Sequence, residues 1–167
     1  MIDRLLDLLT GRAEWSSEQP ANDLASAVAA LLIELARMDD KVDAGERRAI
    51  ENLLARKFGL DPRSVQSLVE QAEQVMQHSA QYFPFTQRIC REASAETRVQ
   101  IIEMLWTVAY SNGALDPHED ALIRQVAGLI QVSDWERGAA RKRAMEKLAE
   151  TTEPARPARG SPWCVAD

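Results

Sequence analysis

Two short stretches of the chain gather acidic and amide side chains, and oxygen atoms are the ligands that hard divalent cations prefer. The first stretch places three aspartates and a glutamate within eight residues, and the second has a similar but less charged set: Asp39, Asp40, Asp43 and Glu46, then Asn112, Asp116 and Glu119. Calcium takes several such oxygens at about 2.3–2.6 Å, and magnesium also prefers oxygen. These seven residues are therefore candidate ligands of Ca²⁺ or Mg²⁺.

The same acids have a second interpretation, as helix caps. Asp43 and Glu46, like Asp116 and Glu119, have the spacing of a capping box, in which each side chain accepts a hydrogen bond from the other residue's backbone N–H. Capping accounts for four of the acids but leaves Asp39 and Asp40 without a role. The positive end of a helix dipole also disfavours a cation. The spacing does not fit an EF-hand loop, and both interpretations stay open.

The two acidic stretches belong to an internal repeat. Residues 36–54 and 109–127 align without a gap at an offset of 73, and the aligned pairs are similar in chemistry: Ala36 with Ala109, Asp39 with Asn112, Val42 with Leu115, Asp43 with Asp116, Glu46 with Glu119, and Ile50 with Ile123. Each copy predicts the end of a helix, a polar turn and an acidic helix start. The repeat therefore indicates a duplicated helical hairpin.

Helical periodicity runs through most of the chain, and no alternating strand pattern is present. Capping and breaking residues predict helices that start at Asn22, Ala44, Pro62, Ser94, Pro117 and Ser133, with a further short helix through Ile89 and Cys90. We therefore expect an all-α fold, a single bundle of about seven to eight helices built from two pseudo-symmetric hairpins. The expected domain is 22–150, with repeats at 22–78 and 94–150, and 151–167 is a disordered tail rich in Pro and Arg.

The first 21 residues are expected to form a short amphipathic helix and a connector. Ile2, Leu5, Leu6 and Leu9 recur at helical spacing, with Asp3, Arg4 and Asp7 on the other side. Because cations are few, docking on the domain is a better interpretation of this helix than membrane-surface binding.

Composition and charge exclude several classes of function. The net charge is −6 with a pI near 5.1, whereas nucleic-acid binding needs a basic face. No signal peptide or membrane-spanning run is evident, and Cys90 and Cys164 have no paired spacing, so we expect a reduced cytoplasmic protein without direct membrane insertion. No nucleophile elbow or phosphate loop suggests an enzyme. Trp15, Trp106 and Trp135 are interpreted as core or groove anchors.

The paired turns resemble the repeated motif of the TerB-like family, tellurite-resistance protein B and its relatives, which reads A-D-G-x-[IL]-x-x-x-E. The two copies here are residues 38–46, M-D-D-K-V-D-A-G-E, and 111–119, S-N-G-A-L-D-P-H-E. A segment from Tyr82 to Ile89, followed by residues 103–110, is similar to one uncharacterised bacterial branch of that family. The resemblance covers roughly residues 22–148.

This resemblance implies an all-helical bundle with internal pseudo-symmetry, a cytoplasmic bacterial protein and a metal site at the motif acids. It also implies no established enzymatic activity, a link to tellurite or stress resistance, and protein partners that include a membrane-associated resistance complex. Asp40 replaces the motif glycine, and Ser111 and Asn112 replace alanine and aspartate. The second turn is therefore the weaker ligand set. The alternative is a purely structural interaction scaffold whose turn acids only cap helices.

Overall fold

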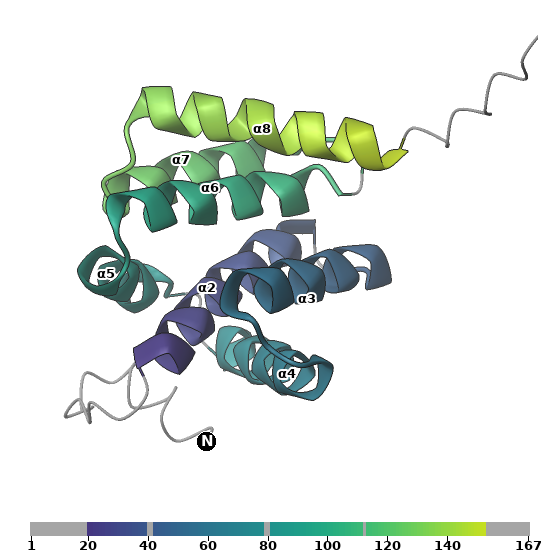
Figure 1. The fold of residues 1–167 in the computed structure, drawn as a ribbon, viewed down its shortest axis with the longest axis vertical. Helices are drawn as coiled ribbons and strands as arrows, with labels where there is room; N and C mark the ends of the chain where they lie inside the picture. The colour runs from purple at the N-terminus through teal and green to yellow at the C-terminus, as the bar shows by residue number, and fades with distance from the viewer. Residues whose placement is uncertain (1–19, 40–41, 79–80, 112, 153–167) are drawn as a thin grey trace, which may run out of the picture.

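The computed structural model describes residues 20–39, 42–78, 81–111 and 113–152, although the side chains at 20–22, 39 and 152 are not described. This part of the chain contains seven α-helices, a short 3₁₀ helix and no strand, which confirms the predicted all-α bundle (Figure 1). The elements are α2 (Pro20–Ala36), η1 (Arg37–Asp39), α3 (Ala44–Phe58), α4 (Pro62–His78), α5 (Phe83–Glu92), α6 (Ala95–Ala109), α7 (Pro117–Leu129) and α8 (Asp134–Thr152).

Two three-helix units form two layers, with α5 beside them. Helices α2, α3 and α4 make the lower layer in Figure 1, and α6, α7 and α8 make the upper one. Moving α4 by the repeat offset of 73 places it on residues 135–151, inside α8. The repeat therefore includes a third helix after each predicted hairpin.

Helices α2 and α6 form the centre of the molecule. Each packs most extensively on the third helix of its own unit, α2 on α4 and α6 on α8, and α2 and α6 also pack on each other. Leu31, Leu32 and Ile33 are consecutive in α2, so they point in different directions, and each is at most 1% exposed. A helix that is apolar on all sides must be surrounded by other elements.

Local sequence sets most helix ends as predicted. Helix α3 spans the predicted residues and ends at Gly59, whose φ of 63° is the left-handed conformation that glycine adopts without strain. Ser94 caps α6 through its hydroxyl. One predicted helix start was wrong. Helix α2 begins at Pro20, before the predicted cap Asn22, because the fixed φ of proline suits a first turn. Helix α7 ends at Leu129, with Gln131 at a φ of 59°.

Helix α5 packs against α2 of the lower unit and α7 of the upper unit. Phe85 and Ile89, four residues apart, are at most 1% exposed. Arg88 is also buried, and its Nη2 lies 2.8 Å from carboxylate oxygens of both Asp23 and Glu92. A short amphipathic helix therefore covers the seam between the units on this side.

The predictions for the two ends of the chain are tested only in part. The amphipathic helix over residues 2–9 lies outside the described residues, as does the predicted tail from 153 onward. Residues 151 and 152, predicted to be tail, instead continue α8. Among the described helices, none combines the length and the apolar character that crossing a bilayer requires.

Candidate functional site

The first acidic turn is a reciprocal helix cap. It connects η1 to α3, and Asp43 is the N-cap residue of α3. Asp43 Oδ1 accepts hydrogen bonds from the backbone N–H groups of Gly45, at 2.6 Å, and of Glu46, at 2.8 Å. In return Glu46 Oε2 accepts from the Asp43 N–H at 3.0 Å. The capping interpretation of these two acids is therefore confirmed.

The second turn repeats this arrangement. Asp116 is the N-cap residue of α7 and accepts from the N–H groups of His118, at 2.7 Å, and of Glu119, while Pro117 occupies the first turn. Glu119 Oε2 accepts from the Asp116 N–H at 3.0 Å, the distance found in the first turn. The duplication has thus preserved the capping interaction as well as the residue types.

The two residues of each cap differ in exposure. Glu46 is 3% exposed and Glu119 is 1% exposed, so both carboxylates face the protein, whereas Asp43 is exposed to solvent. Within the described ranges, no three His, Cys, Asp or Glu side chains are grouped in a way that could hold a metal ion. Asp40, Asn112 and the side chain of Asp39 are outside those ranges. The cation site therefore stays a prediction.

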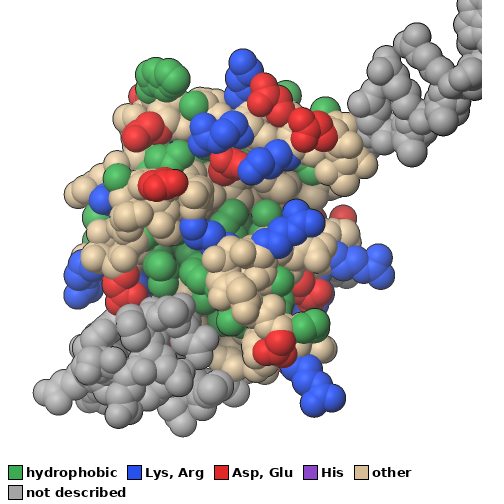
Figure 2. Space-filling view, viewed as in Figure 1, with side chains coloured by type: hydrophobic (Ala, Val, Ile, Leu, Met, Phe, Trp, Pro, Cys, Tyr) green, Lys and Arg blue, Asp and Glu red, His purple; other side chains and the backbone are tan. Residues whose placement is uncertain are grey.

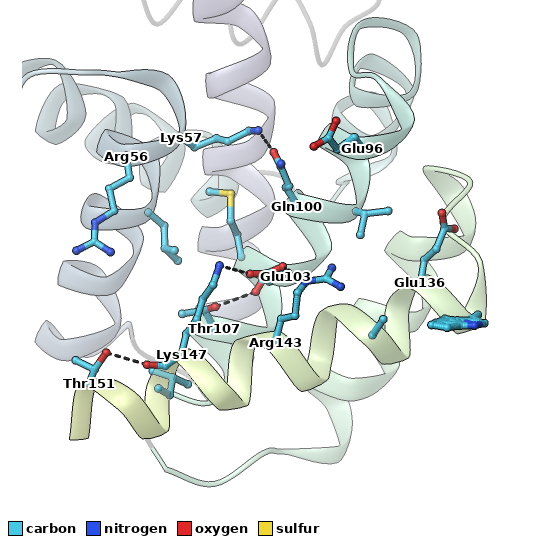
Figure 3. A pocket seen from close by; sticks show the side chains of 16 residues that line it. Arg56, Lys57, Glu96, Gln100, Glu103, Thr107, Glu136, Arg143, Lys147 and Thr151 are labelled. Atoms are coloured by element: carbon cyan, nitrogen blue, oxygen red, sulfur yellow. Dashed lines mark hydrogen bonds and ion pairs between the residues drawn. The ribbon is translucent and has the colours of Figure 1, made fainter. Parts of the chain in front are cut away.

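A groove of about 870 Å³ lies between α3, α6 and α8 (Figure 3). Its lining joins the two units: Leu53, Arg56 and Lys57 from α3; Glu96, Val99, Gln100, Glu103, Met104 and Thr107 from α6; and Trp135, Glu136, Ala139, Arg143, Lys147, Leu148 and Thr151 from α8. In Figure 2, hydrophobic side chains gather in the hollow between the two layers, with Lys and Arg side chains around them. No sequence motif indicated this groove.

Among the predictions from sequence, only the one for the tryptophans bears on the groove. Trp106 is 1% exposed in the core, whereas Trp135 is 74% exposed and lines the groove at the start of α8. Both positions agree with the predicted choice between core and groove anchors. Trp15 lies outside the described residues.

Glu103 lies in the groove with basic side chains from α8 around it. Its carboxylate accepts from Arg143 Nε at 2.7 Å and from Lys147 Nζ at 2.5 Å (Figure 3). Burial raises the pKa of Glu103, but the hydrogen bonds and charges of Lys147 and Arg143 outweigh burial, and the pKa is lowered from 4.5. Lys57 on α3 donates a hydrogen bond to Gln100.

The groove is more basic than the protein as a whole. Its lining contains four cationic side chains, Arg56, Lys57, Arg143 and Lys147, and three carboxylates, Glu96, Glu103 and Glu136, a formal charge of +1. The whole chain carries −6. Glu103 is neutralised by its ion pairs, and Glu136 is engaged in the cap of α8 through Ser133. An acidic ligand therefore suits this surface better than a basic one.

These features define an internally duplicated, all-helical domain with two capped acidic turns. The family model described as Tellurite resistance protein TerB matches residues 25–142, which include both turns and most of the groove. The chain therefore belongs to the TerB family, a family of non-enzymatic helical domains. No curated protein and no solved structure matches it.

The caps predict a matched effect on stability in the two units. Replacing Asp43 or Asp116 by alanine removes the acceptor for the first-turn N–H groups, so each should lower the free energy of unfolding by about 1 kcal/mol. Asn caps about as well as Asp, so the corresponding asparagine variants should remain near wild type. Urea unfolding followed by circular dichroism measures both. A large loss in the asparagine variants would show that charge, rather than capping, stabilises the turns.

The lowered pKa of Glu103 predicts a contribution to stability that depends on pH. A depressed carboxyl pKa stabilises the fold above the pKa of the unfolded chain, near 4.5, and this contribution is lost as pH falls through the folded pKa. Glu103→Gln should therefore be less stable than wild type at pH 7, and the difference should shrink below about pH 4.5. Urea unfolding from pH 7 to pH 3 tests this. Glu146→Gln, an exposed change on α8, is the control and should follow the wild-type profile.

Proposed function

We propose that this TerB module has no catalytic role and acts by binding protein partners in tellurite or stress resistance, with the groove between α3, α6 and α8 as its docking surface. The observation that carries the proposal is the open groove itself, whose lining includes the exposed indole of Trp135 and apolar side chains from both units. Exposed concave apolar surfaces with polar rims are typical of interaction sites.

Physical properties of the lining support a protein ligand. Tryptophan and arginine are the side chains most often found at the energetic centres of protein interfaces, and the groove contains Trp135, Arg56 and Arg143. The basic excess would favour the approach of an acidic partner surface over a basic one. The first capped turn fixes the start of α3, the helix that carries Arg56.

Substitution of Trp135 tests the docking surface. Proteins that co-purify with the tagged chain from the cells that make it should be lost or strongly reduced in Trp135→Ala, since truncating an interface centre costs about 2 kcal/mol or more, roughly thirtyfold in affinity. Quantitative mass spectrometry measures the captured set. Met145→Ala is the matched control, because Met145 is also exposed on α8 but does not line the groove. Equal capture by both variants and the wild type contradicts the proposal.

A divalent cation at the first turn is the second candidate function. The observation that favours it is the exposed side chain of Asp43, which follows two further acids in the sequence, Asp39 and Asp40. Calcium and magnesium are bound by such oxygen ligands. The second turn has Asn112 in place of Asp39 and so carries less charge.

Calorimetric titration with Ca²⁺ and Mg²⁺ distinguishes a cation site from caps alone. Asp43→Asn keeps the cap but removes a charge, so it should weaken binding without lowering stability, and Asp39→Ala should do the same. Asp116→Asn makes the matched change in the second turn and should bind like wild type if the first turn is the site. If wild type shows no saturable heat, the turn acids act only as caps.

A further inference from the structure

We propose that the groove between α3, α6 and α8 binds an amphipathic α-helix of a protein partner, with the apolar face of that helix on the groove and its acidic side chains toward Arg56 and Lys57. The inference rests on the proposed function, because it names the kind of partner that the same docking surface takes. It is carried by the helix that the fold itself places on the equivalent surface, and by the charges of the groove.

The repeat gives the groove an equivalent surface elsewhere on the molecule. Moving α2 and α3 by the offset of 73 places them on residues 93–109 and 117–131, which hold α6 and α7. The contact between α3 and α6 therefore has its counterpart in the contact between α7 and α2. An amphipathic helix, α5, packs on α2 and α7, and its Phe85 and Ile89 are at most 1% exposed. The fold itself thus shows that such a surface accepts a short helix.

Matched residues show how the groove differs from the covered surface. Val126 of α7 is 1% exposed, and Ile130, just after that helix, is fully buried. Their counterparts 73 residues earlier are Leu53 and Lys57 of α3, which line the groove and are only partly buried. Within the described residues, this face of α3 therefore lacks the cover that its counterpart has, and the apolar face of a further helix can supply it.

One charged residue is also matched across the repeat. Asp23, in the first turn of α2, forms an ion pair with Arg88 of α5, whose Nη2 lies 2.8 Å from the aspartate Oδ2. The counterpart of Asp23 is Glu96, in the first turn of α6, which lines the groove. Among the described residues Glu96 has no ion-pair partner. A helix in the groove can therefore pair a basic side chain with Glu96, as α5 pairs Arg88 with Asp23.

The α3 side of the groove favours acidic side chains on the bound helix. Arg56 lies across the groove from Glu96 in Figure 3, and Lys57 donates only to a neutral amide. Neither cation has a carboxylate partner in the described part of the chain. The two cations of α8 in the groove already pair with Glu103. The positive charge that is left for a partner therefore lies on Arg56 and Lys57, and complementary carboxylates there favour binding.

A helix suits this surface better than an extended peptide does. Extended segments usually add to an exposed strand edge or bind in grooves lined with aromatic side chains. The described residues contain no strand, and Trp135 is the single aromatic side chain among those that line the groove. A helix satisfies its own backbone hydrogen bonds, so it can cover an apolar surface that other helices build.

Unbiased peptide selection on the full chain tests the proposal. The probe is a phage-displayed library of random peptides of about 16 residues, enough for roughly four turns of helix. Enriched sequences should have apolar residues three or four positions apart and an excess of Asp and Glu. Synthetic copies should gain helix on binding, measured by circular dichroism, and should shift the indole N–H signal of Trp135 in nitrogen-15 NMR.

Charge reversal on α3 tests the proposed contacts. Arg56→Glu/Lys57→Glu should weaken the affinity for the selected acidic peptide about tenfold, because the reversed charges repel it. A peptide with Lys in place of its Asp and Glu residues should instead gain affinity for this variant. Arg56→Gln, which only removes a charge, should weaken binding by a smaller factor. Arg48→Glu is the matched control, since Arg48 is exposed on α3 outside the groove, and should bind like wild type. Isothermal titration calorimetry measures these affinities.

Several outcomes overturn the proposal. Enrichment of proline-rich or basic sequences, or of none, excludes an acidic helix, and equal losses in Arg48→Glu and Arg56→Glu/Lys57→Glu exclude the proposed contacts. A peptide that binds only after residues 1–19 or 153–167 are removed shows that the chain fills its own groove. A dimer in light scattering that the peptide dissociates shows that a second copy fills it. Both results exclude a partner helix as the occupant.

Partner capture separates this inference from the proposed function. If capture is lost in Trp135→Ala but the selected peptides are extended or basic, the helix is wrong and the docking function stands. If acidic helices bind with the expected dependence on charge but Trp135→Ala leaves capture unchanged, the docking function is wrong and the preference of the groove for such a helix stands.

Discussion

The structure depends on ending a largely buried helix and starting the next one within a few residues. Helices α2 and α6 form the centre of the molecule, so each polar turn that follows lies against the core. The first N–H groups of α3 and α7 have no partner inside their own helix. Asp43 and Asp116 accept from them, and the buried carboxylates of Glu46 and Glu119 accept from the aspartate N–H groups. The acidic motif is therefore first a requirement of folding.

That requirement limits what the turns can bind. A glutamate directed into a cap presents little surface to an ion, and the nearby helix dipole disfavours positive charge. Any cation affinity must then come from Asp43 with the acids that precede it, and this distinguishes the first turn from the second. The groove differs from the turns in this respect. The Glu103 carboxylate there is already neutralised by its ion pairs with Arg143 and Lys147.

The two units are alike in their internal contacts but differ in what covers them. Helix α5 covers α2 and α7 with Phe85 and Ile89 in the core, and it is tied to α2 through the ion pair between Arg88 and Asp23. The counterpart surface on α3 and α6 is open and basic. Duplication therefore produced two equivalent seams, of which one is covered by α5 and the other forms the groove between α3, α6 and α8.

The sequence by itself determined the helices, their caps and the repeat. Asp61 with Pro62, Gly59 and Ser94 set helix ends through backbone conformation and bonds to neighbours only a few residues away, and such local effects can be read from residue type. Only the tertiary structure decided the groove. Its lining brings together Leu53, Met104 and Trp135, and its ion pair joins Glu103 to Lys147. These contacts depend on how three helices pack, and periodicity shows which face of a helix is buried but not which partner covers it.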